Sequence, residues 1–384
     1  MSRPQAVVNP PEYEIQPLNL LAFPRNVNPK CELTGFPATV QLVTPYCTLL
    51  YANEQVAEQS WFGIIQKIAH LMAPLMQAAP MIGTADERAK RSKNVDISKR
   101  SLIEFCLAES SNHLSEHKYQ LSIPAASQAL KYCKELEGEM SVLVVEPYLQ
   151  LTQACLGLKR YTQAQEYLAL AKWVVMNSDK CTDGTRSRLF RLLGQLLIAE
   201  GSFNDAKVEY AKSIYFSSRF YGAESIQTSV VYFQLGDCFL AEGNLESALA
   251  LFDKVVDVWY KFLSNIQLLS TQGGKSEEAA AALINGLTDE QLMEGNMQIE
   301  KVLETRGRIL GPEHIATGEA EYTVGLFEYF MLGNPVQAEG RIVNALRAYQ
   351  TQLGEQHTST KHVASLLDLV KQHSMQDQAL DGQL

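Results

Sequence analysis

Two histidines, His113 and His117, stand four residues apart, a spacing that would place both imidazoles on one face of a helix. Histidine pairs of this kind can bind a metal ion. Here their neighbours are Ser115, Glu116 and Lys118, a polar setting typical of a solvated helix end followed by a turn. We therefore expect the pair to mark the end of a helix inside a repeat, without bound metal.

A second candidate is the run from Gly273 to Ser276, Gly-Gly-Lys-Ser, which resembles the end of a phosphate-binding loop. Such a loop follows an apolar strand and begins with a glycine five residues earlier, but that position is Leu268 and no strand pattern precedes it. The sequence also has no nucleophile elbow of the Gly-x-Ser-x-Gly type. We predict a protein that is not an enzyme and takes no cofactor.

The segment 31–76 has the layout of a MYND zinc finger, in which eight ligands bind two zinc ions. In this chain the eight positions are Cys31, Thr34, Thr44, Cys47, Ala52, Val56, Ile65 and Ala69. The two remaining thiols, Cys31 and Cys47, would be divided between two sites, whereas each structural zinc needs four ligands. The segment is therefore expected to be a degenerate, metal-free finger in which apolar side chains replace the zinc. The alternative is that the likeness is accidental and that a helix over 54–76 follows simple loops.

Composition and charge limit the possible functions. The chain has 384 residues, 46% hydrophobic and 20% charged, and its net charge of −10 disfavours nucleic acid as a partner. Seven cysteines, an odd number, favour a reducing compartment over a disulfide framework. The first residues lack the apolar core of a secretory signal, and no stretch is long and apolar enough to span a membrane. These features predict a cytoplasmic protein without a membrane segment.

Proline separates the chain into parts. Six of its 14 prolines lie in the first 30 residues, whereas four remain after Pro80. Proline breaks helices, so residues 1–30 are expected to be an extended leader. A run of Lys and Arg suggests a basic linker over 77–101. Good helix formers with apolar residues at three- and four-residue spacing then predict an all-α body over 102–373, followed by a disordered tail, 374–384.

The body is repetitive. A small residue followed by apolar residues at regular intervals recurs at Ala164, Ala206 and Ala248, which are 42 residues apart, with a weaker copy at Ser122 and a later one at Ala338. This pattern resembles the tetratricopeptide repeat, an antiparallel helix pair, with longer helices as in kinesin light chains. We predict a solenoid of five such pairs plus a C-terminal helix. The offset of the last copy is assigned to an irregular helix pair over 264–303.

A second pattern links the predicted pairs. Gly222, Gly311 and Gly354 are each followed six residues later by a threonine. Each of these glycines is expected to end one helix, with Ser or Thr starting the next.

A solenoid of this type binds partners along an inner groove lined by the first helix of each pair. The groove positions predicted here are Glu146, Gln153, Arg188, Arg191, Gln195 and Asp237. Their mixed charge suits a peptide or another helical surface. The Lys-x3-Asn pair of chaperone-binding repeats is replaced by Leu149-x3-Gln153 and Arg191-x3-Gln195, so that clamp is incomplete.

A degenerate MYND segment followed by 42-residue repeats, together with the runs Leu102–Cys106, Ile123–Ala126 and Ile214–Ser217, resembles the zinc finger MYND domain-containing protein 12 family over Cys31–His373. The resemblance implies a non-catalytic subunit of a ciliary inner-arm dynein (type d). Its partners would be the dynein heavy chain, a second tetratricopeptide-repeat subunit and other axonemal doublet proteins. Its location would be the cytoplasm and the axoneme of the cilium or flagellum. The alternative is a cytoplasmic adaptor, like a kinesin light chain, for dynein preassembly or cargo.

Overall fold

The computed structural model describes residues 13–24, 28–76, 84–272 and 274–381. The chain divides into two compact units, Met1–Cys181 and Thr182–Leu384, and each is described by itself. Helices make up almost all regular structure of the described residues in both units, which confirms the all-α prediction.

The exception is a small sheet in the first unit. Three antiparallel strands, β1 (Glu14–Pro17), β2 (Val40–Val43) and β3 (Thr48–Tyr51), lie in the order β1-β2-β3. Part of the predicted extended leader is therefore β1, hydrogen-bonded to its own chain, while residues 1–12 lie outside the described part. Four-residue strands are too short to give a reliable alternating pattern in the sequence.

The rest of the segment 31–76 is helical: α1 (Glu54–Ser60), a π-helical turn (Trp61–Ile65) and α2 (Gln66–Met76). An apolar core fills the space between sheet and helices, and it includes Leu42, Leu49, Tyr51, Trp61, Ile64, Ile65, Ile68, Ala69 and Met72. Of the four apolar residues that the sequence pattern aligns with zinc-ligand positions, Ile65 and Ala69 are buried in it, whereas Ala52 and Val56 are only half-buried. The segment is thus held by hydrophobic packing.

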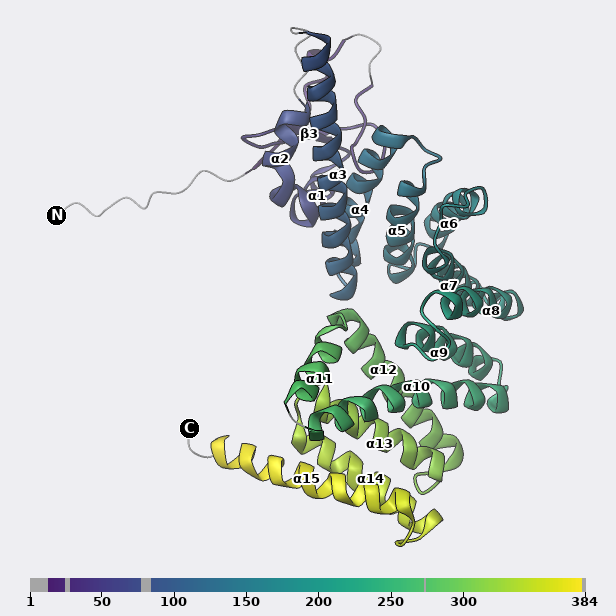
Figure 1. Cartoon of the computed structure of the whole chain (residues 1–384). Helices are drawn as coiled ribbons and strands as arrows, with labels where there is room; N and C mark the ends of the chain where they lie inside the picture. Colours follow the sequence, from purple (N-terminus) through teal and green to yellow (C-terminus); the bar gives the residue numbers. More distant parts are fainter. Residues whose placement is uncertain (1–12, 25–27, 77–83, 273, 382–384) are drawn as a thin grey trace, which may run out of the picture. The chain divides into compact units, whose positions relative to one another are not determined.

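Two helix pairs complete the first unit: α3 (Ala85–Ser115) with α4 (Tyr119–Glu137), and α5 (Val145–Gly157) with α6 (Tyr161–Met176). Figure 1 shows α3 and α4 side by side. A capping box starts α3, in which the Thr84 hydroxyl accepts from the Glu87 N–H and the Glu87 carboxylate accepts from the Thr84 N–H. Because this helix is continuous, the predicted boundary between residues 101 and 102 falls inside it, and residues 77–83 lie outside the described part.

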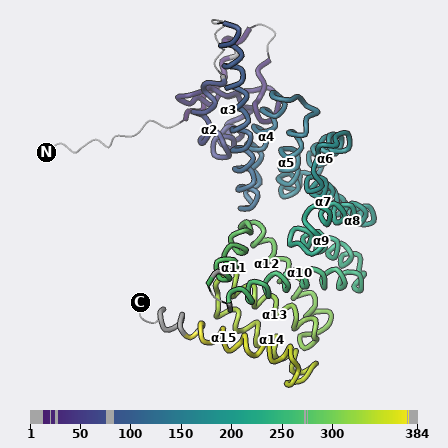
Figure 2. Tube along the Cα trace, viewed as in Figure 1, coloured from purple at the N-terminus to yellow at the C-terminus, as the bar shows by residue number. Residues whose placement is uncertain are grey.

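The second unit holds the remaining helices. They are α7 (Asp183–Ala199), α8 (Phe203–Phe220), α9 (Ile226–Ala241), α10 (Leu245–Gln272), α11 (Lys275–Asn285), α12 (Asp289–Leu310), α13 (Ile315–Phe330), α14 (Pro335–Leu353) and α15 (Thr358–Asp381). The trace in Figure 2 follows α7 to α10 as two successive hairpins. The expected irregular pair is α11 and α12, inserted between α10 and α13. The C-terminal helix α15 continues to Asp381, into the predicted tail, and residues 382–384 lie outside the described part.

The repeated small residue of the sequence is a buried contact in every pair. Ser122, Ala164, Ala206, Ala248 and Ala338 all have 0% exposure, on α4, α6, α8, α10 and α14. In the pairs α7–α8 and α9–α10, the first helix contributes a glycine where the second helix comes close. A Cβ on Gly194 would lie 2.6 Å from the Tyr210 ring, and one on Gly236 would lie 2.7 Å from the Phe252 ring. The predicted close approach of paired helices is therefore present.

The turn inside each pair contains one residue in the left-handed conformation, again every 42 residues. These residues are His117, Lys159, Gly201 and Gly243, with φ of 56°, 59°, 80° and 80°. Gly333 takes the same role before α14 with φ of 62°. His117 thus belongs to a repeat turn, as the sequence predicts, and it closes the turn without the glycine that usually occupies such a position.

The Gly-to-Thr pattern forms the connection between successive pairs. The Thr228 hydroxyl donates to the Gly222 carbonyl at 2.8 Å, and Thr317 and Thr360 donate to Gly311 and Gly354 at 2.9 Å. Each following helix begins near a Ser or Thr, as expected: Ser225 caps α9, Thr317 lies in the first turn of α13, and α15 begins at Thr358. His314 and His357 add a contact in the last two copies, in which Nδ1 accepts from the backbone N–H of Ala316 and of Ser359.

Candidate partner-binding surface

The six predicted groove residues do not all belong to one unit. Glu146 and Gln153 lie on α5 in the first unit, and both are half-buried. Arg188, Arg191 and Gln195 lie on α7, and Asp237 lies on α9, all four half-buried in the second unit. Within the second unit, α12 contacts both helices, through Arg191 of α7 and Asp237 of α9.

The inserted helix α12 contacts two of these four residues. The Lys301 Nζ lies 2.7 Å from an Asp237 carboxylate oxygen, and an Arg191 guanidinium nitrogen lies 3.6 Å from a Glu294 oxygen. Burial raises the pKa of Glu294, Arg191 opposes that rise and Glu290 adds to it. Part of the surface predicted for a partner is therefore paired with the protein's own chain.

Packing fixes α12 on this surface. Gly295 lies against the buried Trp259 of α10, so closely that a Cβ on Gly295 would come within 2.2 Å of the indole ring. Ile299 and Val302 on the same helix are 1% and 0% exposed in the core of the second unit. Arg306 is also buried, and it donates to the Ala316 carbonyl and pairs with Asp253. The helix is thus a permanent part of the core.

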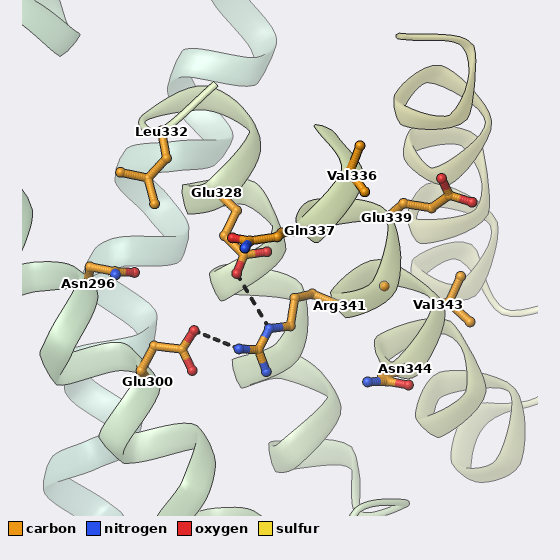
Figure 3. Close-up of a pocket in the computed structure, with 11 residues that line it drawn as sticks. Asn296, Glu300, Glu328, Leu332, Val336, Gln337, Glu339, Arg341, Val343 and Asn344 are labelled. Atoms are coloured by element: carbon orange, nitrogen blue, oxygen red, sulfur yellow. Dashed lines mark hydrogen bonds and ion pairs between the residues drawn. The ribbon is translucent and has the colours of Figure 1, made fainter. Parts of the chain in front are cut away.

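A pocket of about 730 Å³ opens between α12, α13 and α14, and an arginine lies at its centre. Arg341 pairs with Glu300 at 2.7 Å and lies 3.5 Å from Glu328, as Figure 3 shows, while Glu321 lies 3.6 Å away. Three carboxylates thus surround one guanidinium.

Burial raises the pKa of Glu321 and Glu328, and Arg341 opposes both rises. For Arg341 itself, burial lowers the pKa and the three carboxylates raise it, with a net upward shift. Desolvation, together with repulsion from Glu300, therefore outweighs the attraction of the single cation in the pKa of both carboxylates.

Sequence reasoning missed this pocket. Its charged residues come from three helices, and the α11–α12 insertion shifts their spacing out of the 42-residue register. One available signal was the Thr288-x2-Gln291 capping box, which is present in the structure and starts α12. Recognising that helix would have placed Asn296 and Glu300 one turn apart on a common face.

The other candidate sites of the sequence have structural partners. His113 Nε2 lies 3.0 Å from the Gly63 carbonyl, and His117 Nδ1 lies 3.0 Å from the Tyr119 hydroxyl. Cys31 and Cys47 are buried, and the Cys31 sulfur accepts from the Thr34 N–H. Among the described residues, no three His, Cys, Asp or Glu side chains gather as a metal site, and no helix there is long and apolar enough to cross a membrane.

Comparison with known proteins agrees with the repeat architecture. Residues 185–261, which cover α7 to the middle of α10, match the family described as tetratricopeptide repeat. Among solved structures, BtubC (BKLC) from P. vanneervenii is 16% identical, with a TM-score of 0.30, covering 67% of this chain and 94% of that one. Aspartyl phosphate phosphatase F from Bacillus subtilis is 12% identical, with a TM-score of 0.38, covering 83% and 85%. The family match therefore shows tetratricopeptide repeats over residues 185–261, an architecture that serves as a scaffold for protein–protein interaction.

Proposed function

We propose that this protein is a non-catalytic docking subunit of a ciliary inner-arm dynein of type d. In this proposal it binds the tail of the dynein heavy chain and a second tetratricopeptide-repeat subunit, and it resides in the cytoplasm and the axoneme. The assignment to an inner-arm dynein of type d depends on the family resemblance of Cys31–His373. The scaffold role depends on the repeat architecture.

The observation that carries the scaffold role is the repetition of one buried contact in all five helix pairs, from Ser122 to Ala338. Such repeats give a rigid frame whose surface residues can vary without loss of the fold. The side chains exposed on this frame differ from pair to pair, and one example is the charged pocket around Arg341 between α12, α13 and α14.

The charge of the chain limits where it docks. With a net charge of −10, direct binding to the acidic tails of tubulin is disfavoured by like-charge repulsion. We therefore expect the contact with the doublet to run through other axonemal proteins, and the contact with dynein to involve basic or apolar segments of the heavy-chain tail.

Cross-linking mass spectrometry on demembranated cilia, before and after high-salt extraction, tests the proposal. The expected result is a set of cross-links between the second unit and an inner-arm dynein heavy chain, lost from the axoneme together with that heavy chain. Absence of the protein from cilia, with cross-links to chaperones in the cytoplasm, would contradict it and support the adaptor role in dynein preassembly.

A further inference from the structure

The Arg341 pocket contains acceptor oxygens that lack donors. Glu328 is 5% exposed, and its Oε2 has no hydrogen-bond partner, although it lines the pocket. The Asn296 Oδ1, on the α12 side of the same pocket, also has none. Figure 3 shows both side chains at the pocket around Arg341. Buried acceptors without a donor are unfavourable, so the pocket favours a ligand group that donates hydrogen bonds.

The charge of the pocket points to the same kind of ligand. Glu300, Glu328 and Glu339 line it, and Glu321 lies 3.6 Å from Arg341, so the pocket and its border hold four carboxylates and one guanidinium. Three of the four lie within 3.6 Å of Arg341, and the fourth, Glu339, has no ion pair among the described contacts. The cluster keeps a negative excess that a further cation would neutralise.

Apolar side chains form a rim at the pocket and along the adjoining face of α12. Leu332 and Val336 line the pocket and are each 49% exposed. Met293 and Met297 on α12 are 57% and 59% exposed, and at 3.6 residues per turn they share a face with Asn296 and Glu300. Exposed methionines adapt their shape to an apolar partner.

We propose that the Arg341 pocket and its methionine rim bind a basic amphipathic helix of a protein partner. A lysine or arginine of that helix enters among Glu300, Glu328 and the Asn296 oxygen, and its apolar face covers Met293, Met297 and Leu332. The proposal deepens the scaffold function and rests on it, because it names the class of segment that one face of the scaffold binds.

Fluorescence anisotropy with a labelled Leu/Lys amphipathic peptide of 18 residues, on the full chain, tests the proposal. The expected result is saturable binding that weakens with added salt, with no binding of the same peptide carrying Glu in place of Lys. Glu300→Gln/Glu328→Gln should weaken binding about tenfold or more, because the buried charge pairs are lost. Met293→Gln/Met297→Gln should weaken it severalfold, because both substitutions keep good helix formers but reduce the apolar surface.

Matched controls separate the pocket from general charge and apolarity. Glu355→Gln removes an exposed carboxylate beyond the far end of α14, and Leu268→Gln removes an apolar side chain on α10 that is 56% exposed. Both should leave the affinity within about twofold of the unsubstituted protein. If the double Gln variant of the pocket fails to fold, Val336→Lys provides an independent test. This variant keeps every carboxylate and places a competing ammonium at the pocket, so it should also abolish binding.

Equal affinity of the unsubstituted protein, the double Gln variant and Val336→Lys would overturn the proposal, as would equal binding of the acidic peptide. A dimer that the pocket variants disrupt, without any peptide binding, would identify a second copy as the occupant and would also overturn it. These results are distinguishable from failure of the proposed function. If cross-links to dynein persist in cilia that carry Glu300→Gln/Glu328→Gln, the docking function is retained and only the role of the Arg341 pocket as a binding surface is contradicted.

Discussion

Lys301 of α12 lies 2.7 Å from Asp237 of α9, so an inserted helix pairs with a residue predicted to contact a partner. Both side chains of this pair are more than 40% exposed, 44% for Lys301 and 42% for Asp237. An exposed pair contributes about 0–1 kcal/mol to stability, since water and salt screen it. What fixes α12 on this face must therefore be its buried contacts, which include the close approach of Gly295 to Trp259 and the bond of the buried Arg306 to the Ala316 carbonyl.

Gly295→Ala should destabilise the second unit. The added Cβ would overlap the Trp259 ring, and overpacking of this kind costs about 1–3 kcal/mol. Urea unfolding measured by far-UV circular dichroism gives the change in free energy. Gly307→Ala is the control on the same helix, because a Cβ there meets no atom within 4 Å. It should stabilise by about 0.5–1 kcal/mol through helix propensity. Equal effects of the two substitutions would contradict the close packing of α12.

The left-handed turn positions give a second prediction, in which two substitutions change stability in opposite directions. Lys159 and Gly201 hold equivalent left-handed positions with φ of 59° and 80°. A residue with a Cβ is strained there by about 1 kcal/mol, so Lys159→Gly should stabilise the protein and Gly201→Ala should destabilise it. A Cβ on Gly201 meets nothing within 4 Å, which leaves backbone strain as the cause. Thermal melts of both variants check the pair, and the same sign for both would contradict the shared turn geometry.

These turns show how much of the fold the sequence predicts. The repeat pattern located the buried positions from Ser122 to Ala338, because each helix pair needs a small residue at its contact and this requirement recurs along the sequence. The sheet has no such sequence pattern, since its strands have four residues each. The Arg341 pocket has no such pattern either. Its carboxylates Glu300, Glu321 and Glu328 become neighbours only through the packing of three helices, and no local spacing encodes that.

The buried cysteines give a third prediction. All seven cysteines are buried, and four of them lie in the helix pairs with 0–2% exposure: Cys106, Cys133, Cys155 and Cys238. Burial raises the pKa of Cys106 to about 12 and those of the other three to about 11. At pH 8 their thiolate fraction is roughly a hundredfold or more below that of an ordinary thiol. We therefore expect slow reaction with Ellman's reagent in the native state.

Peptide mapping after partial labelling identifies which thiols react. In guanidinium chloride, all seven should react at the rate of free cysteine, because the burial is lost. Ser98→Cys on the exposed part of α3 provides a native-state thiol that should react promptly. Prompt native labelling of Cys106 or Cys133 would show that the α3–α4 pair opens far more readily than its packing implies.

The last prediction concerns the pH dependence of stability at the Arg341 pocket. Burial raises the pKa of Glu328 above 4.5, Arg341 opposes that rise, and Glu300 and Glu321 add to it. The folded protein therefore holds this proton more tightly than the unfolded chain does, so the contribution of Glu328 to stability falls as pH rises through the folded pKa. Glu328→Gln mimics the neutral form and keeps its shape. It should raise the melting temperature at pH 7, and the gap should narrow as pH falls, because protonation makes Glu328 itself neutral.

Differential scanning calorimetry of the two proteins between pH 5 and pH 8 measures that gap, and Glu355→Gln is the matched control at an exposed carboxylate. The control should differ little from the unsubstituted protein across the range, because an exposed charge contributes little. The comparison also shows which is larger for Glu328, the cost of its desolvation or its attraction to Arg341. If Glu328→Gln lowers the melting temperature at pH 7, the attraction between Glu328 and Arg341, 3.5 Å apart, outweighs desolvation. Glu328 would then be stabilised in its ionised form, and the excess of carboxylates over Arg341 would remain for a basic partner to neutralise.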